Sequence, residues 1–356
     1  MEYFAGIDLH SNNSYIAIID NDNKRVFKKK VSNDLHNVLH VLEPHRKQIK
    51  GIVVESTYNW YWLVDGLMEK SYKVHLANPS AIKQYEGLKH SDDVTDAFHL
   101  ANLLRLGILP EGYIYPKEER PVRDLLRKRL QLVQQRTALI LSFENLLSRN
   151  LGTRLKVDEI NKLTEEDVED IFQQEYLIVS GKASIATINF LRTRIEQIEK
   201  TVHKAARLRS EYKLLMTVPG IGKILALTIM YEAGPMERFA KVGNYTSYCR
   251  CVGSERISNG KKKGKGNRKN GNKHLSRAHV EAAYYAIRHY EYIKRYHQRK
   301  MAKTNNIVAR KAIAHKLARA CYYIIRDQKA FDPGKLFAHK IAATVNPYYC
   351  WDNHST

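Results

Sequence analysis

The last third of this 356-residue chain has very few acidic residues. Residues 238–330 contain 24 Lys and Arg against 4 Asp and Glu, a net charge of +20, whereas residues 1–110 hold 13 of each sign. Nearly all of the formal charge of +22 therefore lies in the last third, which indicates a polyanionic partner. Tyrosines are interspersed with these basic residues, so the pattern favours nucleic acid, which offers bases for stacking as well as phosphates.

Long apolar runs are also absent. No run reaches about 18 residues, so no membrane span is predicted, and the chain enters a strand-like run at once, without the charged-then-apolar leader of an exported protein. The spacing of the four cysteines matches no zinc ribbon or finger, which favours a reduced, cytosolic protein, and Cys249-Arg250-Cys251 is interpreted as strand packing. The cysteines are Cys249, Cys251, Cys321 and Cys350.

Four carboxylates stand out in the first third of the chain. Asp8 and Glu55 end short apolar runs, where side chains gather at the edge of a sheet, and Asp93 and Asp96 lie three apart on a predicted helix and so face the same way. Carboxylates from two strands and one helix form a site for hard cations, and paired Mg²⁺ is the usual reagent for cutting phosphodiesters. This grouping predicts a site for Mg²⁺ or Mn²⁺.

Residues 1–110 alternate between strand and helix patterns. Three strands separated by short polar turns come first, followed by helices and strands in alternation, which is the order of a ribonuclease-H-like α/β fold. The strand-like runs are 3–8, 15–19, 25–31, 52–55 and 73–77, and helical segments are predicted near 34–47, 59–70, 80–87 and 93–107.

Residues 120–210 are predicted to be helical. Leucines recur every seven residues from Leu125 to Leu146, and apolar residues from Ile188 to Ala205 step by three and four, as in a coiled-coil seam. The two helices are compatible with an antiparallel hairpin within one chain or with pairing between chains, and sequence does not decide between them.

A mainly helical region begins at Leu214. Val218-Pro219-Gly220-Ile221-Gly222 has the turn of a helix–hairpin–helix motif, which can point backbone N–H groups at a phosphate, although a plain packing joint between helices is an equal alternative. The glycine-rich run 261–273, with seven basic residues and no acid, is expected to be mobile until it meets nucleic acid. Helices resume at 273–288 and 306–326, and the tail 331–356 has no readable pattern.

These motifs together resemble the DEDD-type transposases of the insertion-sequence one-ten family, and most closely its eleven-eleven subgroup. No single motif is specific, but they occur in the family's order across roughly residues 1–325. The matching motifs are Gly6-Ile7-Asp8-Leu9-His10, Val54-Glu55-Ser56-Thr57, Asp93-Val94-Thr95-Asp96-Ala97, Val218-Pro219-Gly220-Ile221-Gly222 and the block Ser258-Asn259-Gly260 to Gly271-Asn272.

The resemblance implies a RuvC-like, metal-binding N-terminal domain and a C-terminal domain with a nucleophilic serine. Asp8, Glu55, Asp93 and Asp96 match the ligand positions, and Ser258 matches the serine. The motif here is Ile257-Ser258-Asn259-Gly260 in place of the family's commoner Ser-Ser-Gly-Gly, which leaves Ser254 as an alternative. The expected nucleic-acid contacts are Arg256, Lys261, Lys262, Lys263, Lys265, Arg268, Lys269, Lys273, Gly220 and Gly222.

The resemblance also implies partners and a domain order. It implies donor and target DNA, a structured noncoding guide RNA, a homo-oligomer (dimer or tetramer) with a site shared between subunits, and a bacterial, nucleoid-associated location in the cytoplasm. The predicted ranges are 1–115 for the RuvC-like domain, 116–212 for the coiled-coil segment, 213–330 for the serine-bearing domain and 331–356 for the tail.

Three other functions compete with a transposase. A junction-resolving nuclease would use the same carboxylates to activate water, without a covalent intermediate. A sugar-kinase or actin-like ATPase also opens with Gly-Ile-Asp after its first strand, but no second phosphate loop follows here. A helix–hairpin–helix protein that only binds nucleic acid would leave the carboxylates unexplained.

Overall fold

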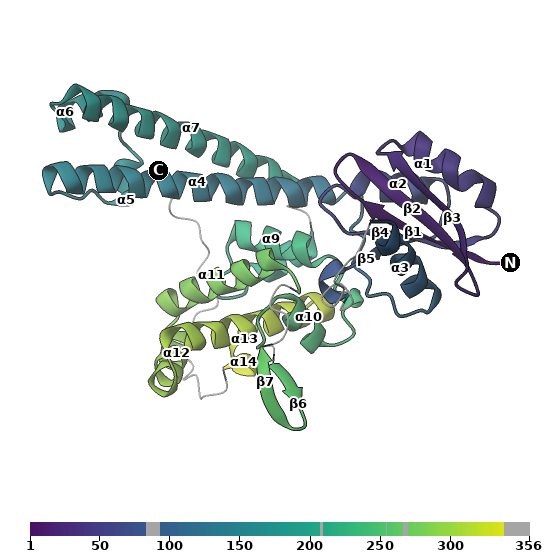
Figure 1. Cartoon of the computed structure of the whole chain (residues 1–356). Helices are drawn as coiled ribbons and strands as arrows, with labels where there is room; N and C mark the ends of the chain where they lie inside the picture. Colours follow the sequence, from purple (N-terminus) through teal and green to yellow (C-terminus); the bar gives the residue numbers. More distant parts are fainter. Residues whose placement is uncertain (83–92, 207–208, 254, 266–269, 338–356) are drawn as a thin grey trace. The chain divides into compact units, whose positions relative to one another are not determined.

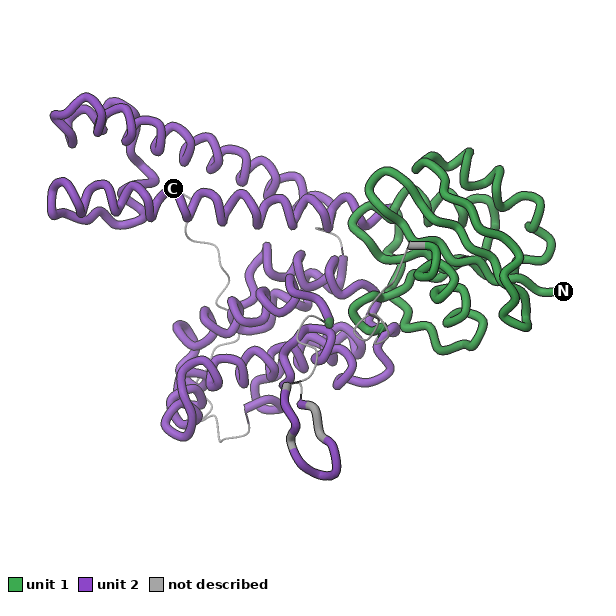
Figure 2. The backbone as a smooth tube through the Cα atoms, in the orientation of Figure 1, with its two compact units in different colours: residues 1–117, 265–270 green, residues 118–264, 271–356 purple. Residues whose placement is uncertain are grey.

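The computed structural model describes residues 1–82, 93–206, 209–253, 255–265 and 270–337 (Figure 1). The chain forms two compact units, which are residues 1–117 with 265–270 and residues 118–264 with 271–356 (Figure 2). The four ranges predicted from the sequence stay a prediction.

The first unit is built on a mixed five-stranded sheet with the order β3-β2-β1-β4-β5. Strands β1 (Tyr3–Leu9), β2 (Asn13–Asp20) and β3 (Arg25–Ser32) form an antiparallel meander. Strand β4 (Ile49–Glu55) then pairs in parallel with β1, and β5 (Val74–Ala77) pairs in parallel with β4. The predicted α/β sheet is confirmed, with its opening three-stranded meander.

Helices cover both faces of this sheet. On one face, α1 (Leu35–Leu42) and α2 (Tyr61–Glu69) share a core with alternate residues of β1 such as Ile7 and Leu9. On the other face, α3 (Asp93–Arg105) packs on β1, β2 and β4. Since side chains alternate along a strand, Asp8 points to the α3 face.

Two short 3₁₀ turns complete the described part of this unit, η1 (Glu43–His45) and η2 (Pro79–Ala81). Of the helix predicted near 80–87, residues 80–81 lie in η2 and Ile82 is extended, and residues 83–92 lie outside the described residues.

The second unit contains a pair of long helices that lie side by side (Figure 1). Helix α4 (Arg120–Leu151) leads through α5 (Val157–Ile160) and α6 (Glu165–Ile171) to α7 (Glu175–Ala206). The two long helices thus pair within one chain, which is one of the two arrangements that the sequence left open. The coiled coil itself, and any pairing between chains, stay predictions.

The apolar seam of this helix pair is divided between two cores. Phe143 and Ile188 belong to a cluster that also takes Phe172 after α6, whereas Leu126 and Val202 join the large core of the remaining helices. The base of the helix pair is therefore part of the same core as the C-terminal helices.

The rest of the unit is mainly helical, as predicted. Its core packs Leu227, Tyr245 and Leu317, and none of the described helices is both long and apolar enough to cross a membrane. The elements are α8 (Ser210–Leu215), α9 (Lys223–Ala233), η4 (Met236–Arg238), α10 (Val242–Tyr248), α11 (Lys273–His289), α12 (Glu291–Lys303), α13 (Asn306–Asp327) and α14 (Pro333–Leu336).

A two-stranded hairpin lies in the region that follows α10. Strands β6 (Glu255–Ser258) and β7 (Lys261–Lys265) pair, so residues 261–265 of the basic run form a strand, and the mobility expected for this run stays a prediction. Asn259 and Gly260 have φ of 50° and 68°, the positive values of a two-residue type I′ turn, which Asn-Gly favours. Cys249 and Cys251 lie in a turn after α10, because that helix ends at Tyr248, so the strand predicted for them is wrong.

Gly220 is a point of close packing between α11 and the turn before α9. A Cβ at Gly220 would lie 2.1 Å from the carbonyl oxygen of Ala282 and 2.8 Å from the nitrogen of Ala286, and its φ is 78°. The packing joint, which was one of the two interpretations of the Gly-x-Gly turn, explains this glycine, because only glycine permits such an approach at positive φ. The helix–hairpin–helix motif stays a prediction.

We therefore expect Gly220→Ala to destabilise the protein by about 2–5 kcal/mol, since overpacking costs roughly 1–3 kcal/mol and a side chain in left-handed backbone roughly 1–2 kcal/mol. Urea denaturation measures the loss. Gly243→Ala is the control, because Gly243 lies in α10 with open space around it. A Gly220→Ala protein of unchanged stability but weaker DNA binding would favour the phosphate-contact interpretation.

Candidate active site

Two of the predicted metal ligands lie side by side at the ends of neighbouring strands. Ile7 of β1 is paired with Val54 of β4, so the next residues, Asp8 and Glu55, follow in the same register on the face covered by α3. Asp8 is buried at 5% exposure, and Glu55 is half-buried. Asp96 stands in the first turn of α3, which packs on both strands.

The carboxylates interact strongly. Burial, a hydrogen bond with Asp8 and the negative charges of Asp8 and Asp96 raise the pKa of Glu55 from 4.5 to about 8. Near neutral pH, the raised pKa favours the protonated form of Glu55. A cation bound here would displace that proton, because it stabilises the charged form of the carboxylate.

Gly6 sets how closely α3 approaches these strands. A Cβ at Gly6 would lie 2.0 Å from the carbonyl oxygen of Ala97 and 2.9 Å from the nitrogen of Ala101. Without a side chain at Gly6, the α3 backbone sits directly on β1, and this contact places Asp96 within electrostatic reach of Glu55.

His10 is a neighbour of the site that sequence reasoning did not select. Its Nε2 lies 3.0 Å from Oδ2 of Asp8, and its carbonyl oxygen accepts hydrogen bonds from Nδ2 of Asn33 at 2.8 Å and of Asn59 at 3.0 Å. The two asparagines come from different loops and hold the segment after β1. Only the proximity of His10 to Asp8 in the motif could have indicated it.

The donor set fits a hard cation. Asp8, Glu55 and Asp96 offer only carboxylate oxygens, which Mg²⁺ and Mn²⁺ prefer. Within the described residues, no three acidic, histidine or cysteine side chains are close enough together to hold one ion, and the side chain of Asp93 at the start of α3 lies outside those residues. The metal-ligand roles therefore stay predictions.

The raised pKa of Glu55 predicts a pH dependence. In the metal-free protein the folded state binds this proton more tightly than the unfolded chain, so the free energy of unfolding falls as pH rises from about 4.5 to 8. We expect about 1–3 kcal/mol between pH 5 and 8.5, since one pKa unit is about 1.4 kcal/mol and solvent screens part of the effect. Glu55→Gln, which cannot ionise, should remove this part of the slope.

Urea denaturation in EDTA at several pH values measures this pH dependence of the free energy of unfolding. Glu118→Gln, at an exposed position, is the control. Mg²⁺ should stabilise the wild type more at pH 8 than at pH 6, because binding competes with the proton. Identical pH slopes for the wild type and Glu55→Gln would contradict the proposed interaction among the carboxylates.

The candidate nucleophile belongs to the second unit. Ser258 is the last residue of β6, directly before the Asn259-Gly260 turn, and is exposed, as are Lys261 and Lys263 on β7. The sequence signal for this hairpin is the Asn259-Gly260 pair. Among the predicted contacts, the side chains of Arg256, Lys262 and Lys265 lie outside the described residues, as do Ser254, Arg268 and Lys269.

Two further predicted contacts lie at helix starts. Lys273 is the first residue of α11, and Gly222 is the N-cap of α9, and both are exposed. Helix N-termini attract phosphate through their free N–H groups. Their contact with nucleic acid stays a prediction.

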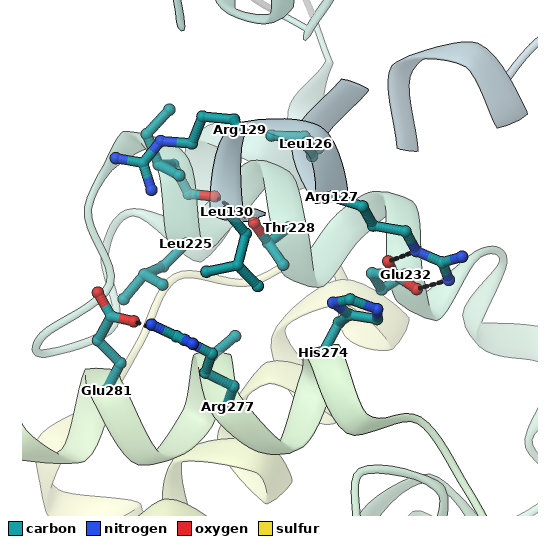
Figure 3. A pocket seen from close by; sticks show the side chains of 12 residues that line it. Leu126, Arg127, Arg129, Leu130, Leu225, Thr228, Glu232, His274, Arg277 and Glu281 are labelled. Atoms are coloured by element: carbon teal, nitrogen blue, oxygen red, sulfur yellow. Dashed lines mark hydrogen bonds and ion pairs between the residues drawn. The ribbon is translucent and has the colours of Figure 1, made fainter. Parts of the chain in front are cut away.

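Two cavities lie among the described residues. One cavity of about 40 Å³ lies between α4, α9 and α11, beside the ion pair of Arg127 with Glu232 (Figure 3), and it has room for little more than water. A second, open pocket of about 230 Å³ is lined by Phe4 and Gly51, near the opposite ends of β1 and β4 from Asp8 and Glu55.

Two family models match the chain. A model for the DEDD transposases of the IS110 family, described as "Transposase", matches residues 5–150, and the model "Transposase IS116/IS110/IS902 family" matches residues 212–298. The first range contains all four carboxylates and the second contains Ser258. Both matches concern the same kind of enzyme, so the comparisons support assignment of this chain to the IS110 family of transposases.

Among solved structures, the chain is similar to T. thermophilus RuvC in complex with a Holliday junction substrate. The sequence identity is 13%, the TM-score is 0.24, and the match covers 32% of this chain and 100% of that chain. A similarity at this TM-score says nothing about the site. The chain matches no curated protein significantly.

Proposed function

We propose that this chain is a DNA transposase that cuts and rejoins strands through a 5′-phosphoserine intermediate, with metal ions held by Asp8, Glu55, Asp93 and Asp96. The observation that supports it most is the interaction of Asp8, Glu55 and Asp96 on one face of the sheet in a chain matched by transposase models. A carboxyl whose pKa is raised by neighbouring carboxylates is a candidate for a functional site.

Ser258 is the proposed nucleophile. Its oxygen attacks the DNA phosphorus, the bond from phosphorus to the 3′ oxygen breaks, and the departing 3′-OH takes up the proton that serine loses. Bond energy is kept in the phosphoserine, so reversal onto a new 3′-OH rejoins strands without ATP. The basic residues of β7 bind phosphate but are poor bases. Metal held by the carboxylates would polarise the phosphate and the leaving oxygen.

The partners follow from the same proposal. Donor and target DNA bind the basic last third, and a structured noncoding RNA guides their choice, as the family resemblance implies. The carboxylates and the serine, which are far apart in sequence, act on one phosphorus, within a chain or across a homo-oligomer.

Ser258→Ala should abolish covalent protein–DNA adducts, because alanine has no nucleophilic oxygen. The measurement is a denaturing gel of the purified protein with Mg²⁺, a plasmid carrying the DNA that flanks the gene, and RNA transcribed from that DNA. Ser184→Ala is the control, since this half-buried serine donates to the carbonyl oxygen of Ser180 in its own helix. Asp8→Asn should lose the adduct without unfolding.

The outcomes separate the competing functions. A Ser258→Ala protein that still forms adducts would move the nucleophile to another residue, with Ser254 the first to test. DNA cut to free 5′-phosphate ends, without attached protein, would favour the junction-resolving nuclease that activates water. Full activity of Asp8→Asn in Mg²⁺ would exclude Asp8 as a ligand.

Binding to DNA should fall steeply with salt. For a 30-base-pair duplex we expect a loss of about 10³-fold or more between 50 and 200 mM salt, as for about six or more neutralised phosphates. Lys261→Ala with Lys263→Ala should lower the slope of log affinity against log salt by about 2. Lys162→Ala with Lys200→Ala, two exposed lysines of the helix-pair region, serves as the control. A flat salt dependence would contradict the basic third as the docking surface.

A further inference from the structure

The segment that carries the Ser258 hairpin begins after Arg250 and ends before Gly271, and these two flanking residues are bound to each other. Both Nε and Nη2 of Arg250 donate to the carbonyl oxygen of Gly271, at 3.1 and 2.7 Å. The backbone nitrogen of Asn272 donates to the carbonyl oxygen of Tyr248 at 2.6 Å. The base of the hairpin is therefore closed by three hydrogen bonds.

The backbone at this base allows few alternatives. Arg250 and Gly271 both have positive φ, 53° and 88°. A Cβ at Gly271 would lie 2.6 Å from the carbonyl oxygen of Tyr248, so the chain passes α10 with no room for a side chain.

Asn272 joins this base to the helical core. Its Oδ1 caps α11 by accepting hydrogen bonds from the nitrogens of His274 and Leu275, at 2.8 and 3.1 Å. Its Nδ2 donates to Oε2 of Glu232 on α9 at 2.7 Å. One buried amide therefore serves as the cap of α11 and as the connection between the hairpin and α9.

Arg127 of α4 in turn binds Glu232. It is 1% exposed, and Nε and Nη2 of Arg127 donate to its two carboxylate oxygens at 2.6 and 2.8 Å (Figure 3). A buried ion pair is a weak source of stability, because desolvation offsets the attraction, but it fixes orientation through its directed hydrogen bonds.

We propose that Glu232, oriented by Arg127, is a positioning residue that fixes the direction of the Ser258 hairpin through Asn272. This inference rests on the proposed function, in which Ser258 is the nucleophile. The bonds run from α4 through Arg127, Glu232 and Asn272 to the closed base of the hairpin. Loss of the bond between Glu232 and Asn272 removes the hold of α9 on the base and leaves only its contacts with α10, while the fold remains.

Asn272→Asp tests the connection. Aspartate keeps the cap of α11, because it offers the same acceptor oxygen, but it loses the donor and puts a second carboxylate beside Glu232. We expect adduct formation to slow roughly 10- to 100-fold, since a displacement of about 1 Å at a reacting atom is sufficient for a 100-fold loss. Affinity for a 30-base-pair duplex should stay within about twofold, because Lys261 and Lys263 remain on the hairpin.

A second readout is independent of catalysis. Hydrogen exchange of the amides of 255–265 in the free, full-length protein should be faster in Asn272→Asp, while the amides of α9 and α13 exchange as in the wild type. The double variant Glu232→Gln with Asn272→Asp exchanges donor and acceptor and keeps the net charge. It should recover most of the lost rate, as expected for two residues that act through one contact.

Arg129→Met is the matched control. Arg129 lies on the same helix as Arg127 and forms an ion pair at 2.6 Å with Glu199 of α7, which has no bond to Asn272. Its loss should leave the adduct rate and the exchange of 255–265 unchanged.

The outcomes separate the two proposals. If Ser258→Ala abolishes adducts but Asn272→Asp changes neither the adduct rate nor the exchange of 255–265, the positioning role is overturned and the proposed function stands. If Asn272→Asp lowers the rate only in proportion to the unfolded fraction, the contact is merely structural and the inference is also overturned. If Ser258→Ala keeps its adducts, the proposed function fails by itself.

Discussion

The site in the first unit depends on one close approach, the contact of the α3 backbone with β1 at Gly6. The space for a Cβ is absent there, since the carbonyl oxygen of Ala97 would lie 2.0 Å from it. Asp96 immediately precedes Ala97, so this contact fixes the height of its carboxylate above the sheet. The raised pKa of Glu55 depends in part on that height, because the charge of Asp96 contributes to it. Gly6 on β1 thereby contributes to the raised pKa of Glu55 on β4.

The parts of this arrangement that sequence could predict are those with a local period. The five strands and the helix starting at Asp93 followed from alternation and helical spacing, and the strand ends correctly placed Asp8 beside Glu55. The Asn259-Gly260 turn was also readable, but its hairpin was not predicted because the lysines that follow have low strand propensity. In β7, the Asn-Gly turn and the pairing with β6 outweigh the low strand propensity of lysine.

The contacts that hold the Ser258 hairpin have no local signal. Arg127 and Glu232 are 105 residues apart, and Glu232 and Asn272 are 40 apart. The sequence is compatible with many partners for an arginine on a long polar helix and for a glutamate on an apolar one. Only the tertiary structure shows that these two side chains pair. Gly220 was ambiguous for a similar reason, because the backbone that it touches belongs to α11.

Two glutamates show how the same side chain serves opposite purposes in the two units. Burial raises the pKa of both, but the neighbours of Glu55 are carboxylates, which raise it further to about 8. The neighbours of Glu232 are Arg127 and Asn272, whose hydrogen bonds and charge outweigh its burial and lower its pKa. Glu232 is therefore paired within its own protein, whereas the surroundings of Glu55 disfavour its charged form. A carboxyl perturbed in this way beside other carboxylates is a candidate for a functional site, which agrees with the metal-ligand role proposed for Glu55.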